Sequence, residues 1–302
     1  MPGTYFGPHS EQYSDYAFQT HANLGRFPLG HILILPDGRE YRFTLNDGTI
    51  EVAGNLYQSV AALAGHTNRA ADVVRAIGAS AMSATITTTV AAADIYTEGV
   101  AHVNNDTGEG YSYRIKRAMT AGDAHASASS VGVLTVNLAP GEVIKVALDT
   151  TSEITFTRNR YHQTTIHLGP PTALLTGVSP GVAAADRFYW SQVKGYSAVL
   201  ANLTLLAGLP VQASIDVNGA VEGVKRRLQV TSTGSVLSAG YATAGIITDQ
   251  DGSIVGGAIG ISASTTTVLD ITGGIANNSP VVGLCVKANA STEFALIDLR
   301  ID

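Results

Sequence analysis

The sequence predicts an all-β protein made of antiparallel β-sandwich or barrel modules, with an extended N-terminal arm and at most one or two short helices. Short segments of alternating or β-branched residues recur along the 302 residues, and turn-forming Gly, Asp, Asn and Pro separate them. Only 14% of the residues are charged, while 32 glycines supply positions for turns and bulges. Together these features are typical of closely packed strands rather than of helices with charged faces.

The clearest pattern is a meander near the start of the chain. An apolar run, His31–Leu35, is followed by the turn Pro36-Asp37-Gly38 and the alternating segment Arg39–Leu45. A second turn, Asn46-Asp47-Gly48, precedes the segment Thr49–Ala53. Asp-Gly between alternating segments is a strong signal for a β-hairpin, so we expect three consecutive strands here.

Further strand segments follow at the spacing of a sandwich or barrel. In the first half we expect strands at Ala84–Val90, Glu98–Val103, Gly110–Lys116, Val131–Leu138, Glu142–Leu148 and Glu153–Arg158. In the second half we expect them at Phe188–Val193, Ser197–Leu200, Val211–Val217, Val224–Val230, Thr266–Ile271, Val281–Lys287 and Glu293–Ile301.

One segment has helical spacing. Within Asn68–Ile77, the residues Ala70, Val73, Val74 and Ile77 lie at positions i, i+3, i+4 and i+7, and Gly78 follows as a stop signal. This pattern predicts a single short helix.

Three regions are expected along the chain. Residues 1–29 show no strand or helix period and are rich in aromatic residues, so we interpret them as an arm that docks on its own body or on a neighbouring subunit. The prolines of Gly169-Pro170-Pro171 mark a boundary between a first β domain, residues 30–168, and a second, residues 169–302. The candidate interaction residues are the arm anchors Tyr5, Phe6, Tyr13, Tyr16 and Phe18.

Composition bears on partners and location. The formal net charge is -6, and Lys225-Arg226-Arg227 is the one tight basic cluster, so we expect no nucleic-acid partner. No segment resembles a signal peptide or a membrane span, which predicts synthesis in a cytoplasm and no membrane contact. The single cysteine, Cys285, lies in an apolar run and is expected to be buried.

The sequence offers no set of residues that would support catalysis, and we expect neither an enzyme nor a cofactor or metal site. The phosphate-binding motifs Gly-x-x-x-x-Gly-Lys-Ser/Thr and Gly-x-Gly-x-x-Gly are missing from the sequence. Glu98 and Glu109 could pair as carboxylates, and Asp249–Ser253 faintly resembles a calcium loop, but both are better interpreted as turn or strand residues. His162 and His167 are expected to be exposed strand residues, and Trp190 a core or interface anchor.

Several segments spread along the chain carry a resemblance to known proteins: Asp37–Phe43, Ala53–Gln58, Tyr96–Gly99, Asn105–Lys116, Phe188–Gly195, Pro210–Ser214, Gly219–Val221 and Pro280–Leu284, with the last strand to Asp302. They resemble a family of structural proteins of tailed bacteriophages, found in marine and environmental phages. The resemblance implies a β-rich head protein without catalytic residues: a decoration or cement protein on the capsid surface of the virion, bound to the major capsid protein and to copies of itself, with a homotrimer as the expected state. The alternative is a fibre, spike or adhesin-like protein that binds host carbohydrate.

Overall fold

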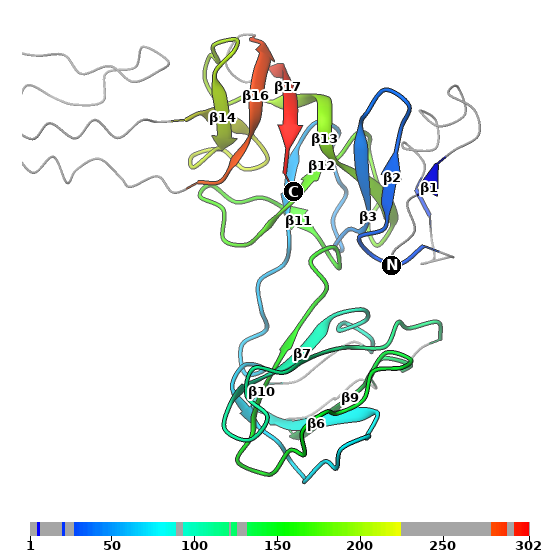
Figure 1. Cartoon of the computed structure of the whole chain (residues 1–302). Helices are drawn as coiled ribbons and strands as arrows, with labels where there is room; N and C mark the ends of the chain where they lie inside the picture. The colour runs from blue at the N-terminus through cyan, green and yellow to red at the C-terminus, as the bar shows by residue number, and fades with distance from the viewer. Residues whose placement is uncertain are drawn as a thin grey trace, which may run out of the picture.

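The computed structural model describes residues 5–6, 20–21, 27–88, 93–120, 122–125, 132–224, 279–288 and 293–301. Within these residues the protein is all-β and contains no helix, which confirms the predicted fold class. The paired strands are antiparallel except for β1 and β2, which are parallel. The strands form two modules, one above the other in Figure 1.

The larger module, here called the split module, is one curled sheet of 11 strands. Its main path runs β1-β2-β3-β13-β17-β16-β14-β15, and β4, β11 and β12 join it through β13. The strands are β1 (Tyr5–Phe6), β2 (Ile32–Ile34), β3 (Glu40–Leu45), β4 (Leu56–Gln58), β11 (Thr165–Ile166), β12 (Leu175–Val178), β13 (Phe188–Leu200), β14 (Pro210–Ala213), β15 (Val221–Gly223), β16 (Val281–Lys287) and β17 (Phe294–Arg300).

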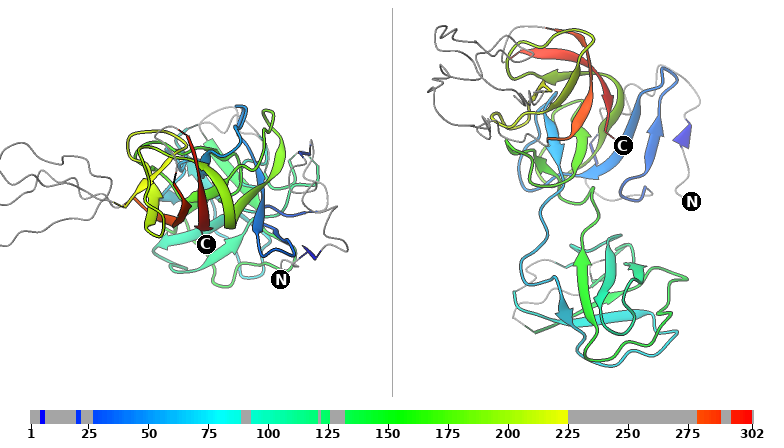
Figure 2. Two further views of the ribbon diagram at one scale, coloured as in Figure 1. Left: turned by 90° about the horizontal axis from the view of Figure 1, so that it is seen from above. Right: turned by 60° about the vertical axis from the view of Figure 1, so that its left-hand side comes forward.

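The smaller module is inserted into the chain of the larger one, between β4 and β11. This inserted module, about residues 60–159, has a four-stranded sheet of order β5-β10-β7-β8 and a two-stranded sheet, β6-β9. Two chain segments connect it to the split module, as Figure 1 and the right-hand view of Figure 2 show. Its strands are β5 (Arg69–Ala70), β6 (Ala81–Ile86), β7 (Val100–Asn105), β8 (Ser112–Arg114), β9 (Gly132–Asn137) and β10 (Glu153–Thr157).

Each module has its own hydrophobic core. In the inserted module, Tyr96, Phe156 and neighbouring aliphatic residues are buried between the two sheets. In the split module, one cluster lies under β13, β16 and β17, and a second contains Trp190 and Phe43. Trp190 is completely buried and Cys285 nearly so, which confirms both as core residues.

The modules are also joined by a polar contact beside the connecting segments. Glu98 of the inserted module accepts a hydrogen bond from the Leu29 backbone N–H at 2.6 Å, and Arg117 Nη2 donates to the Phe27 carbonyl at 2.8 Å. Arg117 Nε lies 3.6 Å from Glu98 Oε1. Burial raises the pKa of Glu98, which Arg117 and the Leu29 N–H partly oppose. The segment before β2 is therefore fixed to both modules.

The predicted domain boundary at residues 168 and 169 is not where the strands divide. β3, from the expected first domain, pairs with β13 from the expected second domain through residues such as Phe43 and Trp190. Residues 30–168 therefore do not form a domain by themselves: the sheet of the split module uses the chain on both sides of an insertion. Local sequence signals cannot reveal this arrangement, because strand pairing joins residues far apart in the chain.

The helix predicted at Asn68–Ile77 is also wrong. Arg69 and Ala70 form β5 and pair with β10, and Asn68 has a positive φ of 51°. Val74 and Ile77, expected on the buried face, are exposed. Tertiary pairing with β10 outweighs the helical spacing here.

Two predicted strands are turns or isolated bridges instead. In Thr49–Ala53, Glu51 forms a single bridge to Ala183, and the segment does not extend the hairpin of β2 and β3. In Glu142–Leu148, Leu148 forms a bridge to Arg75. Val224–Val230, apart from its first residue, and Thr266–Ile271 lie outside the described residues.

Among the described residues, no helix has the length and apolar character needed to cross a membrane.

The inserted module is expected to fold alone, because its core is separate and its ends meet where the Phe156 N–H donates to the His66 carbonyl at 3.1 Å. A fragment of residues 60–159 should give a β-type circular dichroism spectrum and a cooperative thermal transition. Phe156→Ala in that fragment should remove about 3–5 kcal/mol of stability. A fragment without a cooperative transition would show that this core depends on the split module.

Candidate functional site

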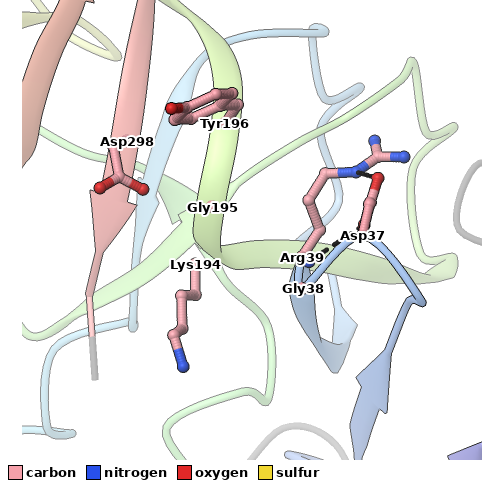
Figure 3. A pocket seen from close by; sticks show the side chains of 7 residues that line it. All are labelled: Asp37, Gly38, Arg39, Lys194, Gly195, Tyr196 and Asp298. Atoms are coloured by element: carbon pink, nitrogen blue, oxygen red, sulfur yellow. Dashed lines mark hydrogen bonds and ion pairs between the residues drawn. The ribbon is translucent and has the colours of Figure 1, made fainter.

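A polar hollow lies where three parts of the split-module sheet meet (Figure 3). Its volume is about 460 Å³, and it is open to solvent. Figure 3 shows Tyr196 and Asp298 on the neighbouring strands β13 and β17, with Asp37 and Arg39 across from them at the turn between β2 and β3. The lining residues are Asp37, Gly38, Arg39, Lys194, Gly195, Tyr196 and Asp298.

The hollow exists because β13 bends at Gly195. The first part of β13 pairs with β3 and the second part with β17, and the register with β3 shifts between Gln192 and Lys194. Gly195 has a φ of 82°, which favours glycine, and a Cβ atom there would lie 3.0 Å from Arg39 Cγ. The buried Gln192 side chain donates to the carbonyls of Lys194 at 3.1 Å and Tyr196 at 3.0 Å. These two bonds hold the bend.

The opposite side of the hollow is formed by the tight turn of the β2–β3 hairpin. Gly38 has a φ of 86°, and its N–H donates to the Leu35 carbonyl at 2.9 Å. Asp37 accepts from the Arg39 N–H at 3.1 Å and from Arg39 Nε at 2.7 Å. Desolvation raises the pKa of Asp37, but the hydrogen bonds and charge of Arg39 outweigh it, so the pKa lies below its ordinary value. The carboxylate is therefore held in a fixed position and charged.

The remaining charges also have partners close to them. Lys194 Nζ lies 2.6 Å from Glu40 Oε1, and Arg300 donates to Asp298 Oδ2 at 3.1 Å. Tyr196 stands directly opposite Asp298 in the strand pair, and 59% of its surface is exposed. The hollow thus combines an exposed aromatic ring with carboxylates and cations that are already balanced.

The hollow was not predicted, although its parts were visible in the sequence. The segments Asp37–Phe43 and Phe188–Gly195, which carry the resemblance to phage proteins, form paired strands at this site. The predicted arm anchors are only partly described: Tyr5 and Phe6 form β1 and pair in parallel with Leu33 and Ile34 of β2. The other three, Tyr13, Tyr16 and Phe18, lie outside the described residues.

A buried carboxyl group lies elsewhere in the split module. Glu51 is 1% exposed, and Thr164 Oγ1 donates to its Oε1 at 3.4 Å. Burial raises the pKa of Glu51 to about 8, although hydrogen bonds from Tyr189 and Thr164 lower it. At neutral pH the protonated form prevails, so Glu51 is an uncharged carboxylic acid in the interior of the split module.

A second buried polar cluster contains a serine, a histidine and a glutamate, but it does not form a catalytic relay. His167 Nδ1 accepts from the Gly219 N–H at 2.8 Å, and His167 Nε2 contacts the Ser214 carbonyl, not its hydroxyl, at 3.1 Å. The Ser214 hydroxyl donates to Glu222 Oε2 at 3.1 Å. Glu222 also accepts from the side chains of Asn202 and Gln212. These bonds connect β14, β15 and their loops.

The expectation that His162 and His167 are exposed is wrong, because both are buried. Desolvation lowers the pKa of both, that of His162 to about 4 with a further contribution from Arg158. Glu98 and Glu109 lie at opposite ends of β7, which spans about 20 Å, so they do not form a carboxylate pair. Within the part of the chain that the structure describes, no three His, Cys, Asp or Glu side chains group as metal ligands.

Two sequence interpretations fall outside the described residues: the basic cluster Lys225-Arg226-Arg227 and the calcium-like segment Asp249–Ser253. The chain matches no protein-family model, no curated protein and no solved structure. The resemblance to tailed-phage structural proteins therefore stays a prediction.

Gly195→Ala should destabilise the protein more than Gly208→Ala. Both glycines have a φ of 82°, so both substitutions incur the strain of about 1–2 kcal/mol expected for a left-handed residue. Only at Gly195 would the new Cβ meet another side chain, since nothing lies within 4 Å at Gly208. Urea unfolding of the two variants measures the difference, and equal losses would show that Arg39 does not constrain the bend.

Glu51→Gln should stabilise the protein increasingly as the pH rises from about 4.5 to about 8. The folded protein keeps the Glu51 proton up to about pH 8, whereas the unfolded chain releases it near the ordinary value of 4.5. Any stability from this carboxyl is complete below pH 4.5 and is lost toward pH 8, by at most about 1.4 kcal/mol per pH unit. Glutamine does not titrate and avoids this loss.

The measurement is urea unfolding of wild type and variant at pH 5, 6.5 and 8. Glu109→Gln, which changes an exposed carboxyl, is the matched control. A stability difference for Glu51→Gln that stays constant over this pH range would contradict the raised pKa.

Proposed function

We propose that this protein is a structural virion component, a decoration or cement protein that binds the outer surface of a phage capsid. The observation that carries the proposal is the distribution of exposed apolar side chains over two modules. Ile50 and Val182 of the split module and Val74, Ile77 and Met119 of the inserted module each expose about two thirds of their surface. Covering such side chains with neighbouring proteins would be favourable, at about 1.5–3 kcal/mol for each one fully buried.

Two modules suit the bridging of neighbouring subunits. Each module has its own core, and the contact of Glu98 and Arg117 with residues 27–29 fixes one module to the other. A body of this kind can contact two capsid subunits at once, and repeated contacts strengthen one another through effective concentration. The partners would be the major capsid protein and further copies of this chain, which we propose to be a homotrimer.

The N-terminal arm is proposed as the anchor to the capsid or to a neighbouring copy. Tyr5 and Phe6 add a strand to β2 through backbone pairing, the mode by which extended segments join a sheet edge. The same mode would let this segment, with the aromatic residues at Tyr13, Tyr16 and Phe18, join another subunit. Such a role is mechanical and requires no catalytic group.

Deleting residues 2–19 should weaken binding to capsids while the protein stays folded. The deletion retains His21, which bonds to the backbone of Phe188, and Phe27, which packs on Trp190. Particles of a tailed phage carrying this gene would be prepared without the protein and mixed with purified wild-type or truncated chain. Electron microscopy with a gold-labelled antibody then measures occupancy on heads and tails.

Wild-type protein should label heads, and the truncated protein should label them at least about tenfold less at equal concentration. Labelling of tails by the wild-type protein would instead support the alternative, a fibre or spike protein that binds the host. Wild-type labelling of neither part would contradict a virion role. Full occupancy by the truncated protein would contradict only the proposed role of the arm, not the binding of the protein to capsids.

A further inference from the structure

We propose that the hollow at the bend of β13 binds a neutral saccharide, with the ring of Tyr196 as its stacking surface. This inference goes beyond the proposed function and does not depend on it. It is carried by the way in which β13, β17 and the β2–β3 turn bring an exposed ring, two carboxylates and two cations around one hollow.

The aromatic surface is the first element of the site. Tyr196 belongs to the outward face of β13 and is 59% exposed, whereas Ser197, next in the strand, is buried. The face of an aromatic ring is negative, so it attracts the weakly positive C–H groups on the apolar face of a pyranose. An exposed ring beside polar groups can thus hold a sugar by one face and leave its hydroxyl groups at the edge.

Hydrogen-bonding groups that could contact those hydroxyls line the same hollow. Asp298 is directly opposite Tyr196, and Asp37 and Arg39 line the other side of the hollow at the β2–β3 turn. A carboxylate has about four acceptor positions, and the Arg300 contact uses one of those on Asp298. A guanidinium has five N–H donors, of which the contact of Arg39 with Asp37 uses one. Vicinal hydroxyl groups, which both donate and accept, match this set.

The charges favour a neutral ligand over an anionic one. Asp37 and Asp298 balance Arg39 and Lys194 among the lining residues, and Lys194 is also paired with Glu40 at 2.6 Å. An acidic sugar would have to compete with carboxylates that already contact these cations. A neutral polyhydroxyl compound can add hydrogen bonds while every ion pair remains.

The size and stability of the hollow are suitable. A volume of about 460 Å³ lies within the range of roughly 300–1,000 Å³ for small-molecule sites. The site is also formed in advance, because Gln192 holds the bend from inside and Asp37 and Arg39 hold each other at the turn. Little conformational entropy would then be lost on binding.

The experiment uses the full chain on an array of neutral and acidic glycans, followed by titration of the best-bound neutral oligosaccharide. Variants are Tyr196→Ala, Tyr196→Phe and, as the matched control, Tyr111→Ala, which removes an exposed tyrosine of the inserted module. Tyr196→Ala should weaken binding by about tenfold or more, because the stacking surface is lost. Tyr196→Phe keeps that surface and should stay within about threefold of wild type, and Tyr111→Ala should match wild type.

Three results would overturn the proposal: binding of acidic glycans only, binding of no glycan, or equal affinity of wild type and Tyr196→Ala. Thermal unfolding of each variant checks that the fold is retained. Since Tyr196 is exposed, its replacement should leave the melting temperature within a few degrees of that of the wild type.

Discussion

The split module depends on a change of partner along β13, from β3 in its first part to β17 in its second part. This one strand therefore joins the hairpin near the start of the chain to the last strand. The change of partner requires a bend, and Gly195 allows it because it can adopt a φ of 82°. The Gln192 amide then donates hydrogen bonds to two carbonyls at the bend, those of Lys194 and Tyr196. The curl of the sheet and the polar hollow both follow from this local geometry.

Strand pairing in the same sheet also holds together the two ends of the insertion between β4 and β11. β4 pairs with both β11 and β12, so the chain on either side of the inserted module is held together by backbone hydrogen bonds. The insertion can then have its own core without interrupting the sheet from which it starts. Its contact through Glu98 and Arg117 with residues 27–29 adds a third connection. A contact that includes a buried carboxylate is sensitive to geometry, because its desolvation is balanced only when the partners are in place.

Local sequence patterns correctly predicted the features that depend on residues close together in the chain. The Asp37-Gly38 turn and the alternation in Arg39–Leu45 led correctly to a hairpin, and the all-β class followed from many such segments. Two strands, Phe188–Val193 and Ser197–Leu200, were expected where the structure has the single strand β13, which continues through a bulge. The hollow could not be predicted, since Lys194 and Glu40 are separated by 154 positions and meet only through strand pairing. The helix at Asn68–Ile77 was wrongly predicted for the same reason. The spacing of its apolar residues does not show that this segment pairs with β10, which lies far away in the chain.

The small number of charges connects the two proposals. In the interior, Glu222 is held by neutral amide and hydroxyl donors, and Glu51 is protonated at neutral pH. At the hollow, Asp37 and Arg39 neutralise each other. A surface whose charges are few and mutually balanced can be covered by a protein or by a neutral sugar without leaving an ion unpaired, which is the main cost of covering polar surface. The small number of balanced charges therefore favours contact with uncharged partners at both the apolar surfaces and the hollow.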